Sequence, residues 1–449
     1  MKRLGAVAAL VCGAGFTFAV VGCSSDNSAG ATDSGSGDDS STGPGPSGHD
    51  GGGVFPTDSS LPPSNDSSTP VTNDGSTPSG DGSTPTGGDG STPIPPGDGG
   101  SPADGGPDPW ASPGTDATVP VFTNTLVCFG SGGTGPCSRT VDATASFPAT
   151  GTYSKVLMHV TLNCPSNGCD PWDRAGSIDL VQDLGGGDES LIELGRFMTP
   201  YGITAGTNSP PAWDIDVTEL RPLLAGSVKI RVFIDTWVPQ GNAAQYGGGW
   251  VVGTTFNMTG GKPAKTPIAV LPIWTWKTSG KEPTQVVFGD PKYPIDQSVP
   301  AQTLSLPAGA TSFGIRSVIT GHGQANLDNC AEFCSENHTW TVNGAANTSA
   351  MWRTDCANFP SQGTYQYSRA GWCPGADVTP WDIDVTKQVG TGSSVTIGYD
   401  VASYLNTCNG LSDGGGLCSG CSSGESCQYN GGDHTQPFYY VNSVLIAFR

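Results

Sequence analysis

The chain has 449 residues, too many for one typical domain, and it combines 67 glycines and 37 prolines with only 13% charged residues. Its formal net charge of −21 argues against nucleic acid as a partner, because a polyanion would repel so acidic a chain. The composition therefore predicts about two folded domains together with segments that do not fold.

The first 22 residues are a predicted lipoprotein signal peptide. A basic start at residues 1–3 precedes an apolar run over residues 4–21, which leads into the bacterial lipobox Val-Val-Gly-Cys23. Cleavage before Cys23 would leave an acylated N-terminal cysteine, so we expect an exported protein that is lipid-anchored at the outer membrane or cell surface. The alternatives are a plain signal peptide with a chance cysteine and a transmembrane span, for which the apolar run is short.

Residues 23–118 predict a disordered tether rich in Ser, Gly, Pro and Asp. This segment contains 14 aspartates and no lysine or arginine, and the string Asp-Gly-Ser-Thr-Pro begins at Asp74, Asp81 and Asp89. Such a composition cannot bury a core. A flexible coil of this length spans roughly 50 Å, which would let the folded part reach large substrates away from the lipid anchor.

From residue 119 onward the pattern is that of an all-β fold. Short runs rich in Val, Ile, Thr, Phe and Trp alternate with Gly, Pro, Asn and Asp turns. The hexapeptide Trp-Asp-Ile-Asp-Val-Thr begins at Trp213 and again at Trp381, which indicates a duplicated unit. We therefore predict two antiparallel eight-stranded jelly-roll (β-sandwich) domains packed side by side, at residues 119–264 and 265–449.

The cysteines agree with export to an oxidising compartment. Of 14 cysteines, Cys12 leaves with the signal peptide and Cys23 is the predicted lipidation site. The other twelve could form up to six disulfides: Cys128, Cys137, Cys164, Cys169, Cys330, Cys334, Cys356, Cys373, Cys408, Cys418, Cys421 and Cys427. The last four of these could instead bind zinc, although two disulfides are the favoured interpretation of their Gly/Ser-rich loop.

The first candidate for a catalytic group is Asp173. Cys164 and Cys169 can close a small loop directly before the string Trp172-Asp173-Arg174. A disulfide there would hold the acid beside an aromatic wall that strips water and a guanidinium that orients it. The alternative is a stapled β-turn with an ordinary surface ion pair.

Two further acids are candidates. Asp235 ends a strongly apolar run, where an acid is costly unless it faces solvent or a site. Glu332 lies in the short loop between Cys330 and Cys334. Each acid alone could be a solvated turn residue. If they converge with Asp173, the site lies between the two domains.

The aromatic residues suggest a sugar ligand, and the histidines raise the question of a metal site. Indole rings stack on sugars and cations, although each tryptophan could also be a core residue. Three histidines in the second domain could in principle bind copper or zinc, but they lack the tight spacing of a metal site, and we predict no metal and no cofactor. The residues concerned are Trp172, Trp237 and Trp372, and His322, His338 and His434.

These residues together resemble the peptide-N-glycosidase F family, bacterial amidases that remove asparagine-linked glycans. The resemblance spans both predicted domains, roughly residues 140–449, with its motifs in the same order. In the first domain the motifs are Cys164-Pro-x-x-x-Cys169-Asp-x-Trp172-Asp173-Arg174, Gly195-Arg-Phe-x-Thr-Pro-Tyr201, Ile215-Asp-Val-Thr218, Leu223-Leu-x-Gly226 and Asp235-Thr-Trp237. In the second they are Ile319-x-Gly-x-Gly323, Cys330-Ala-Glu332-x-Cys334, His338-Thr339 and Arg369-Ala-Gly-Trp-Cys-Pro-Gly375.

The resemblance implies two jelly-rolls with the active site in the cleft between them. It implies that Asp173 activates water for attack on the amide between asparagine and the first N-acetylglucosamine. Arg174 would orient this acid or the substrate, and Glu332 would contact the reacting end through water or sugar. Asp235, the fourth predicted catalytic residue, falls where the family has glutamate in a Glu-Thr-Trp string.

The resemblance also implies how substrate and backbone are held. Arg369 and Trp372 match a substrate-binding wall in the second domain, and Trp237 matches the tryptophan of the Glu-Thr-Trp string. The predicted substrate-binding set is completed by Trp172, Tyr201 and His322. The implied disulfides are Cys164–Cys169, Cys330–Cys334 and Cys356–Cys373, and the other six cysteines have no counterpart.

Four positions depart from the family pattern. Asp235 is one methylene shorter than the glutamate of the family. His322, Phe333 and Gly202 each stand where the family has tryptophan. Because indoles stack on sugars, these departures concern glycan specificity more than the chemistry.

We therefore predict an amidase that releases the glycan as a glycosylamine and leaves aspartate, with an N-glycoprotein or glycopeptide as its partner. We expect a monomer that contacts the membrane only through its lipid anchor. Two alternatives stay open. One is a non-catalytic glycan- or protein-binding surface lipoprotein. The other is a copper-dependent monooxygenase, because paired jelly-rolls also serve that chemistry and three histidines share one domain.

Overall fold

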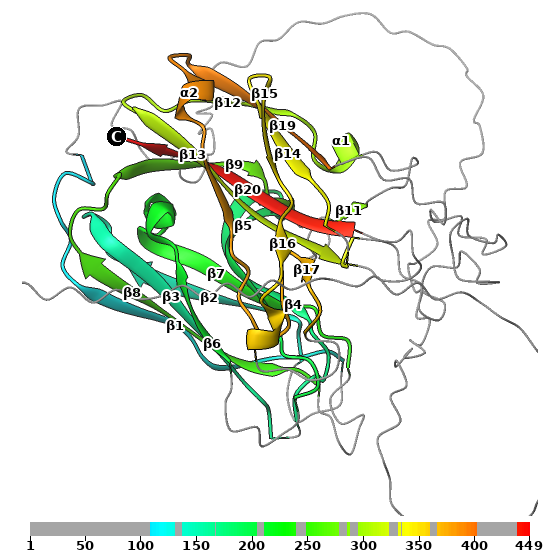
Figure 1. Cartoon of the computed structure of the whole chain (residues 1–449). Coiled ribbons are helices and arrows are strands. Elements are labelled where there is room, and N and C mark those ends of the chain that lie inside the picture. Colours follow the sequence, from blue (N-terminus) through cyan, green and yellow to red (C-terminus); the bar gives the residue numbers. More distant parts are fainter. Residues whose placement is uncertain are drawn as a thin grey trace, which may run out of the picture. The chain divides into compact units, whose positions relative to one another are not determined.

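The computed structural model describes residues 108–130, 137–166, 168–203, 211–238, 248–277, 285–287, 295–322, 331–333, 335–359, 366–401 and 438–449. The predicted signal peptide, Cys23 and all but the end of the predicted tether lie outside these residues. Within them the protein is almost entirely antiparallel β-structure, as predicted (Figure 1). No helix in this part of the chain is long and apolar enough to cross a membrane.

The first jelly-roll consists of eight strands in two facing sheets. One sheet has the order β1-β8-β3-β6 and the other β2-β7-β4-β5, which is the jelly-roll arrangement. A short ninth strand, β10 (Trp276–Lys277), pairs with β5. The eight strands are β1 (Ala117–Val127), β2 (Thr140–Phe147), β3 (Tyr153–Asn163), β4 (Ala175–Gly185), β5 (Asp188–Met198), β6 (Ala212–Asp216), β7 (Gly226–Ile234) and β8 (Trp250–Gly260).

The second jelly-roll repeats the same topology. Its sheets have the orders β9-β20-β13-β18 and β12-β19-β14-β15, so each strand occupies the place of its counterpart in the first. These strands are β9 (Pro267–Trp274), β12 (Gln302–Ser305), β13 (Ser312–His322), β14 (His338–Val342), β15 (Ala345–Ser349), β18 (Trp381–Asp384), β19 (Ser394–Val401) and β20 (Phe438–Phe448). The other described elements are β11 (Gln285–Val287), β16 (Trp352–Arg353), β17 (Arg369–Ala370), η1 (Thr218–Leu223), η2 (Cys356–Asn358), α1 (Ile295–Ser298) and α2 (Thr386–Val389).

The repeated hexapeptide occupies equivalent positions in the two jelly-rolls. Its first copy forms β6, which pairs with β3, and its second forms β18, which pairs with β13. In both copies the threonine N–H donates to the second aspartate of the string, Thr218 to Asp216 at 2.9 Å and Thr386 to Asp384 at 3.0 Å. The same turn thus leads into a short helix twice, which agrees with a duplicated unit.

Strand β20 belongs to the cores of both jelly-rolls. Alternate side chains of a strand point to opposite faces, and here both faces are covered. Tyr439, Val441 and Leu445 pack in the second core, whereas Val444 and Ile446 pack in the first. This explains why β20, drawn in red in Figure 1, is a nearly continuous apolar run instead of an alternating one.

Polar side chains also cross between the jelly-rolls. Arg196 on β5 is buried and forms a bidentate ion pair with buried Glu193, at 2.8 and 2.7 Å. The same guanidinium donates to Thr320 Oγ1 on β13 at 2.7 Å and to the Tyr440 carbonyl on β20 at 3.0 Å. Burial raises the pKa of neighbouring Asp179 well above its ordinary range, and the charge of Glu193 raises it further. A single arginine therefore joins three strands from both sandwiches.

The packed chain begins before the predicted domain boundary at residue 119. Trp110 is buried, and its ring lies 4.6 Å from the guanidinium of Arg221, which is itself buried. Arg449, the last residue, donates to the Trp110 carbonyl at 2.9 Å and forms an ion pair with Asp108. The Pro, Asp and Gly content of residues 108–118 matches that of the tether, so composition does not distinguish this packed end.

This packing predicts that the start of a recombinant chain matters. The free energy of unfolding of a chain that begins at Val119 is expected to be about 2–3 kcal/mol lower than that of a chain that begins at Asp108. The shorter chain loses the packing of the Trp110 ring on the Arg221 guanidinium. For a folded part of about 330 residues that corresponds to a fall in Tm of roughly 3–5 °C. Differential scanning calorimetry measures the difference. Trp110→Ala in the longer chain should account for most of it, and equal Tm values would contradict the assignment.

Candidate active site

The loop from Cys164 to Cys169 is closed by a disulfide with a Cα–Cα distance of 4.6 Å. It connects β3 to β4 at one end of the first jelly-roll. Backbone hydrogen bonds fix the residues after the loop: the Arg174 N–H donates to the Trp172 carbonyl at 3.0 Å, and the Thr199 N–H donates to the Arg174 carbonyl at 2.9 Å. The string that carries the predicted catalytic acid is therefore held at the end of β5 as well as by the disulfide.

Asp170 organises this loop from its interior. Its carboxylate is fully buried and accepts hydrogen bonds from the Trp172 N–H at 3.0 Å and Arg174 Nε at 3.1 Å. It also accepts from Thr236 Oγ1 at 2.6 Å, which ties the loop to the end of β7. A buried carboxylate with several donors orders the groups around it. Arg174, predicted to orient Asp173 or the substrate, thus makes its ion pair with Asp170.

Asp173 lies between the two jelly-rolls. Its side chain is 21% exposed, and Oδ2 lies 3.8 Å from Arg369 Nη2, an ion pair without a hydrogen bond. Burial raises the pKa of Asp173, and the positive charges of Arg369 and Arg174 oppose this rise. A partly desolvated carboxylate with a raised pKa is a stronger base than an ordinary aspartate.

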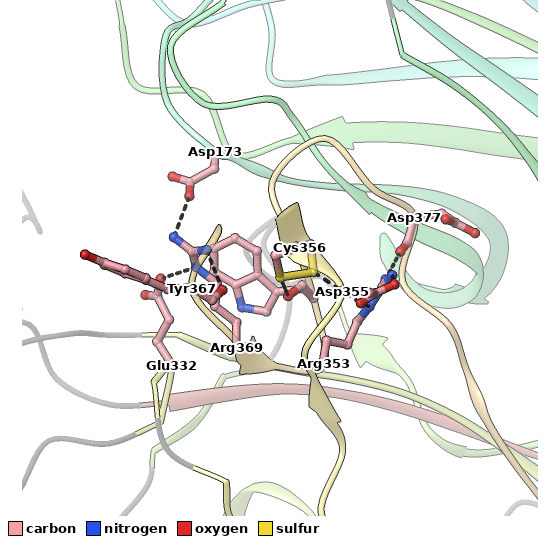
Figure 2. Close-up of a disulfide and its surroundings, with 10 residues drawn as sticks. Asp173, Glu332, Arg353, Asp355, Cys356, Tyr367, Arg369 and Asp377 are labelled. Atoms are coloured by element: carbon pink, nitrogen blue, oxygen red, sulfur yellow. Dashed lines mark hydrogen bonds and ion pairs between the residues drawn. A yellow bond between two sulfur atoms is a disulfide. The ribbon is translucent and has the colours of Figure 1, made fainter. Parts of the chain in front are cut away.

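Arg369 joins the first predicted acid to the second (Figure 2). Its side chain is 1% exposed, and Nε donates to Glu332 Oε1 at 3.1 Å while Nη2 faces Asp173. The guanidinium packs 5.0 Å from the Phe333 ring and 4.8 Å from the Trp372 ring. The Ala370 N–H, next in the chain, donates to the Glu332 carbonyl at 2.9 Å. Side chain and backbone therefore both fix Glu332 against this arginine.

The chain after Arg369 is attached to the first jelly-roll. The Gly375 N–H donates to the Met198 carbonyl at 3.2 Å, and the Met198 N–H donates to the Ala376 carbonyl at 2.8 Å. A disulfide joins Cys356 to Cys373 within this segment. The pairing explains how an arginine of the second jelly-roll is positioned on an aspartate of the first.

Asp235, at the end of β7, is paired with an arginine that the sequence did not suggest. Asp235 Oδ1 accepts a hydrogen bond from Arg139 Nη1 at 2.9 Å. The Arg139 guanidinium lies 4.0 Å from the ring of Trp237, which is 44% exposed. The Asp235 N–H donates to the Ala175 carbonyl at 2.9 Å, so this group lies on the strand next to the one that begins after Asp173.

Trp172, just after the disulfide-closed loop, and Tyr201, just after β5, form an aromatic pair. Their ring centroids are 5.8 Å apart at an interplanar angle of 59°. The Gly202 N–H, where the resemblance has tryptophan, donates to the Pro171 carbonyl at 2.6 Å. Both rings are partly exposed, as a substrate-contacting surface requires.

His322 stacks between Trp372 and Phe438, at centroid distances of 5.4 and 5.3 Å and interplanar angles of 22° and 24°. Burial lowers its pKa to about 3, and the charges of Arg196 and Arg369 act in the same direction. The ring is therefore neutral at neutral pH. Trp372, predicted as part of the substrate-binding wall, is only 2% exposed and is covered by His322.

His338, in contrast, is a core residue. It lies on β14, is fully buried and hydrogen-bonds the Tyr399 hydroxyl through Nδ1 at 2.7 Å. His434 lies outside the described residues. In the described part of the chain no three His, Cys, Asp or Glu side chains are grouped so that they could hold a metal ion. The two described histidines of the copper alternative thus belong to different environments.

The disulfides agree with the resemblance where they are described. The structure contains Cys164–Cys169 and Cys356–Cys373, while Cys330 and Cys334 lie outside the described residues. It also joins Cys128 to Cys137, a pair that the resemblance left unassigned. Cys408, Cys418, Cys421 and Cys427, with their zinc alternative, lie outside the described residues as well.

The fold and the site together define a class: a double jelly-roll protein with a partly buried carboxylate at the junction of its two sandwiches. Comparisons narrow the class. Family models of peptide-N-glycosidase F match at residues 118–246 (N-terminal model) and 292–414 (C-terminal model). The peptide-N(4)-(N-acetyl-beta-D-glucosaminyl)asparagine amidase F of Elizabethkingia miricola is 30% identical over 301 residues, 64% of this chain and 78% of that protein.

Solved structures show the same fold. PNGase F, a glycosylasparaginase from Flavobacterium meningosepticum, aligns with a TM-score of 0.56 at 24% identity over 75% of this chain and 96% of that one. PNGF-II aligns with a TM-score of 0.53 at 20% identity over 74% of this chain and 65% of that one. The chain belongs to the peptide-N-glycosidase F family. It is accordingly a hydrolase of the amidase type that acts on N-linked glycans.

Proposed function

We propose that this amidase hydrolyses the bond between an asparagine side chain and the first N-acetylglucosamine of an N-linked glycan, with Asp173 as the base. The observation that carries the proposal is the Arg369 bridge, which places Asp173 of one jelly-roll and Glu332 of the other on a single guanidinium. Substrate bound there would meet both acids at once.

In the proposed reaction Asp173 accepts a proton from a water molecule while the water oxygen attacks the amide carbon. A tetrahedral oxyanion forms, and the C–N bond then breaks. The glycosylamine leaves with the proton that Asp173 returns, and the substrate protein keeps an aspartate. The glycosylamine then loses ammonia to water. Arg369 and Arg174 provide positive charge beside the developing oxyanion, where a fixed charge stabilises the transition state most effectively. Glu332 would orient the sugar or the water at the reacting end.

The aromatic residues around these acids supply the proposed glycan wall. His322 would line it on the second jelly-roll with the buried Trp372 ring behind it, and Trp237 lies on the first. Trp172 and Tyr201 would contact the substrate on the side of the disulfide loop. Sugar rings stack on such surfaces with little loss of side-chain entropy.

The test of this function uses a denatured N-glycoprotein and reads the mass of the peptide that carried the glycan. The protein should remove the whole glycan and convert asparagine to aspartate. Asp173→Asn should lower the rate by about 10²–10⁴-fold, the range for a lost general base. Asp183→Asn, at the far end of the strand that begins after Asp173, is the matched control and should keep full rate. Glycan binding without conversion would support the binding-module alternative instead.

The pKa of Asp173 predicts the acid side of the pH profile. A base must be deprotonated, so kcat/KM should fall as pH is lowered through a pKa above 3.8, the ordinary value for aspartate. His322, with its pKa of about 3, should add no inflection near 6.5. The measurement is kcat/KM from pH 3 to 9. An inflection near 6.5 that disappears in His322→Asn would contradict this assignment.

We further propose that the folded part is a monomer held at the outer membrane or cell surface through acylated Cys23. The lipobox and the tether composition support this location. Cys23→Ser expressed in a bacterial host should release the protein from the membrane fraction. Retention of the variant in that fraction would overturn the proposal.

A further inference from the structure

A second disulfide lies next in the chain to residues that contact Asp235 and Trp237. Cys128 and Cys137 are bonded with a Cα–Cα distance of 5.3 Å, and Cys128 is fully buried. The Cys128 N–H also donates to the Ser138 carbonyl at 2.9 Å. Phe129 follows the first cysteine and Arg139 lies two residues after the second. The disulfide therefore fixes the backbone on which these two side chains stand.

Arg139 contacts two groups that the site already contains. Its Nη1 donates to Asp235 Oδ1 at 2.9 Å, and its guanidinium carbon lies 4.0 Å from the Trp237 ring centroid. Phe129 supports both, 5.5 Å from the guanidinium and 5.3 Å from the Trp237 ring at 51°. The exposed fractions are 19% for Arg139 and 27% for Asp235, so the pair is partly accessible to solvent.

The cluster is coupled to the base through backbone and side chain. The Ile234 N–H donates to the Arg139 carbonyl at 3.1 Å, which joins the chain after the Cys128–Cys137 disulfide to the end of β7. Thr236, between Asp235 and Trp237, donates to the buried Asp170 carboxylate that also holds Arg174. The Asp170 hydrogen bonds hold the backbone of this strand end in place independently of the Arg139 side chain.

We propose that Arg139 is a positioning residue that holds Asp235 and Trp237 in the arrangement that recognises the substrate. Here Arg139 fixes the aspartate carboxylate at one point and the indole plane of Trp237 at another. Together they form a rigid wall on the first jelly-roll for the N-acetylglucosamine end of the glycan. This inference rests on the proposed function, because it assigns the sugar-recognition side of the same site.

The pairing makes a reciprocal prediction. Asp235→Glu alone should impair recognition, because a longer carboxylate no longer matches the fixed guanidinium. Asp235→Glu combined with Arg139→Ala should cost little more than either change alone, because both changes break the same pair. Lysine in place of Arg139 should not keep KM at the value of the unchanged protein. A compact ammonium cannot pair with a carboxylate and at the same time stack flat on an indole.

The experiment measures KM and kcat on an N-glycopeptide for the whole chain and these variants. Arg139→Ala is expected to raise KM about tenfold with kcat within about threefold, since a stacked ion pair is worth on the order of a factor of ten. A structural role would instead lower Tm and kcat together. Arg316→Ala is the matched control: it also removes a partly buried Arg–Asp pair, with Asp382, six residues before the site end of β13. It should leave KM unchanged.

A binding readout separates this inference from the proposed function. In an Asp173→Asn background the glycopeptide binds without turnover, and adding Arg139→Ala should weaken its Kd about tenfold. If Asp173→Asn keeps full activity, the proposed base is wrong whatever Arg139 does. If Asp173→Asn is inactive while Arg139→Ala changes neither KM nor Kd, the positioning role is overturned and the proposed function stands. Recovery of KM by Arg139→Lys would also overturn it.

Discussion

Arg369→Ala is expected to lower kcat/KM by about 10³-fold, the upper range for loss of one preorganised charge at a reacting centre. The side chain is nearly inaccessible to water and pairs with both Asp173 and Glu332. Its loss would leave these two acids without the cation between them. Arg369→Lys should recover little, because an ammonium lacks the planar fork that reaches both acids and stacks on Trp372.

The ribbon of β16 and β17 offers a matched control for this variant. Arg353 is the cross-strand partner of Arg369 and makes its ion pair with Asp355, 2.7 Å away, instead of with the candidate acids (Figure 2). Arg353→Ala should therefore keep kcat/KM within about threefold, because a partly exposed pair contributes little. Equal losses in both variants would show that the ribbon, and not the bridging charge, is what the reaction needs.

Arg196→Met is expected to reduce the free energy of unfolding by about 3–5 kcal/mol, because it leaves Glu193 buried without its partner. It also removes the donor to Thr320 and to the Tyr440 carbonyl, the contacts that join the jelly-rolls. Urea titration followed by tryptophan fluorescence measures the change. The effect should be larger than for Arg316→Ala, whose ion pair with Asp382 is more exposed.

A second variant shows whether the unpaired charge is the cause. Arg196→Met with Glu193→Gln removes the charge as well as the partner and should be more stable than Arg196→Met alone. Burial already raises the pKa of Glu193 although Arg196 lowers it, so the folded chain tolerates the neutral acid. If the double variant is as unstable as the single one, lost packing and not an unpaired charge accounts for the destabilisation.

The sequence predicted the fold class because its signals are local. Strand alternation and turn residues need only neighbouring positions, and the repeated hexapeptide marks the sixth strand of each jelly-roll. The packing of residues ahead of the predicted boundary at residue 119 had no such local signal. Trp110 packs on Arg221, more than a hundred positions away, and the composition around Trp110 carries no sign of this contact.

The site was predictable to the extent that its residues lie in motifs. Asp173 and Glu332 each stand beside cysteines, and Arg369 lies in a motif of the resemblance. Arg139 has no such marker, because its partner Asp235 is 96 positions away and the intervening chain is what brings them together. Asp170 was visible in the first motif, yet its role as a buried acceptor appears only in three dimensions.

The sharing of β20 between two cores has a consequence for how the chain folds. β20 follows every other described strand in the sequence, and its alternate residues complete both hydrophobic cores. Domains usually fold one after another from the N-terminus during synthesis. Because residues 444–448 supply part of the first core, we expect neither sandwich to reach its final packing before β20 is in place. A chain cut short by a few residues would leave two unfinished domains in place of one.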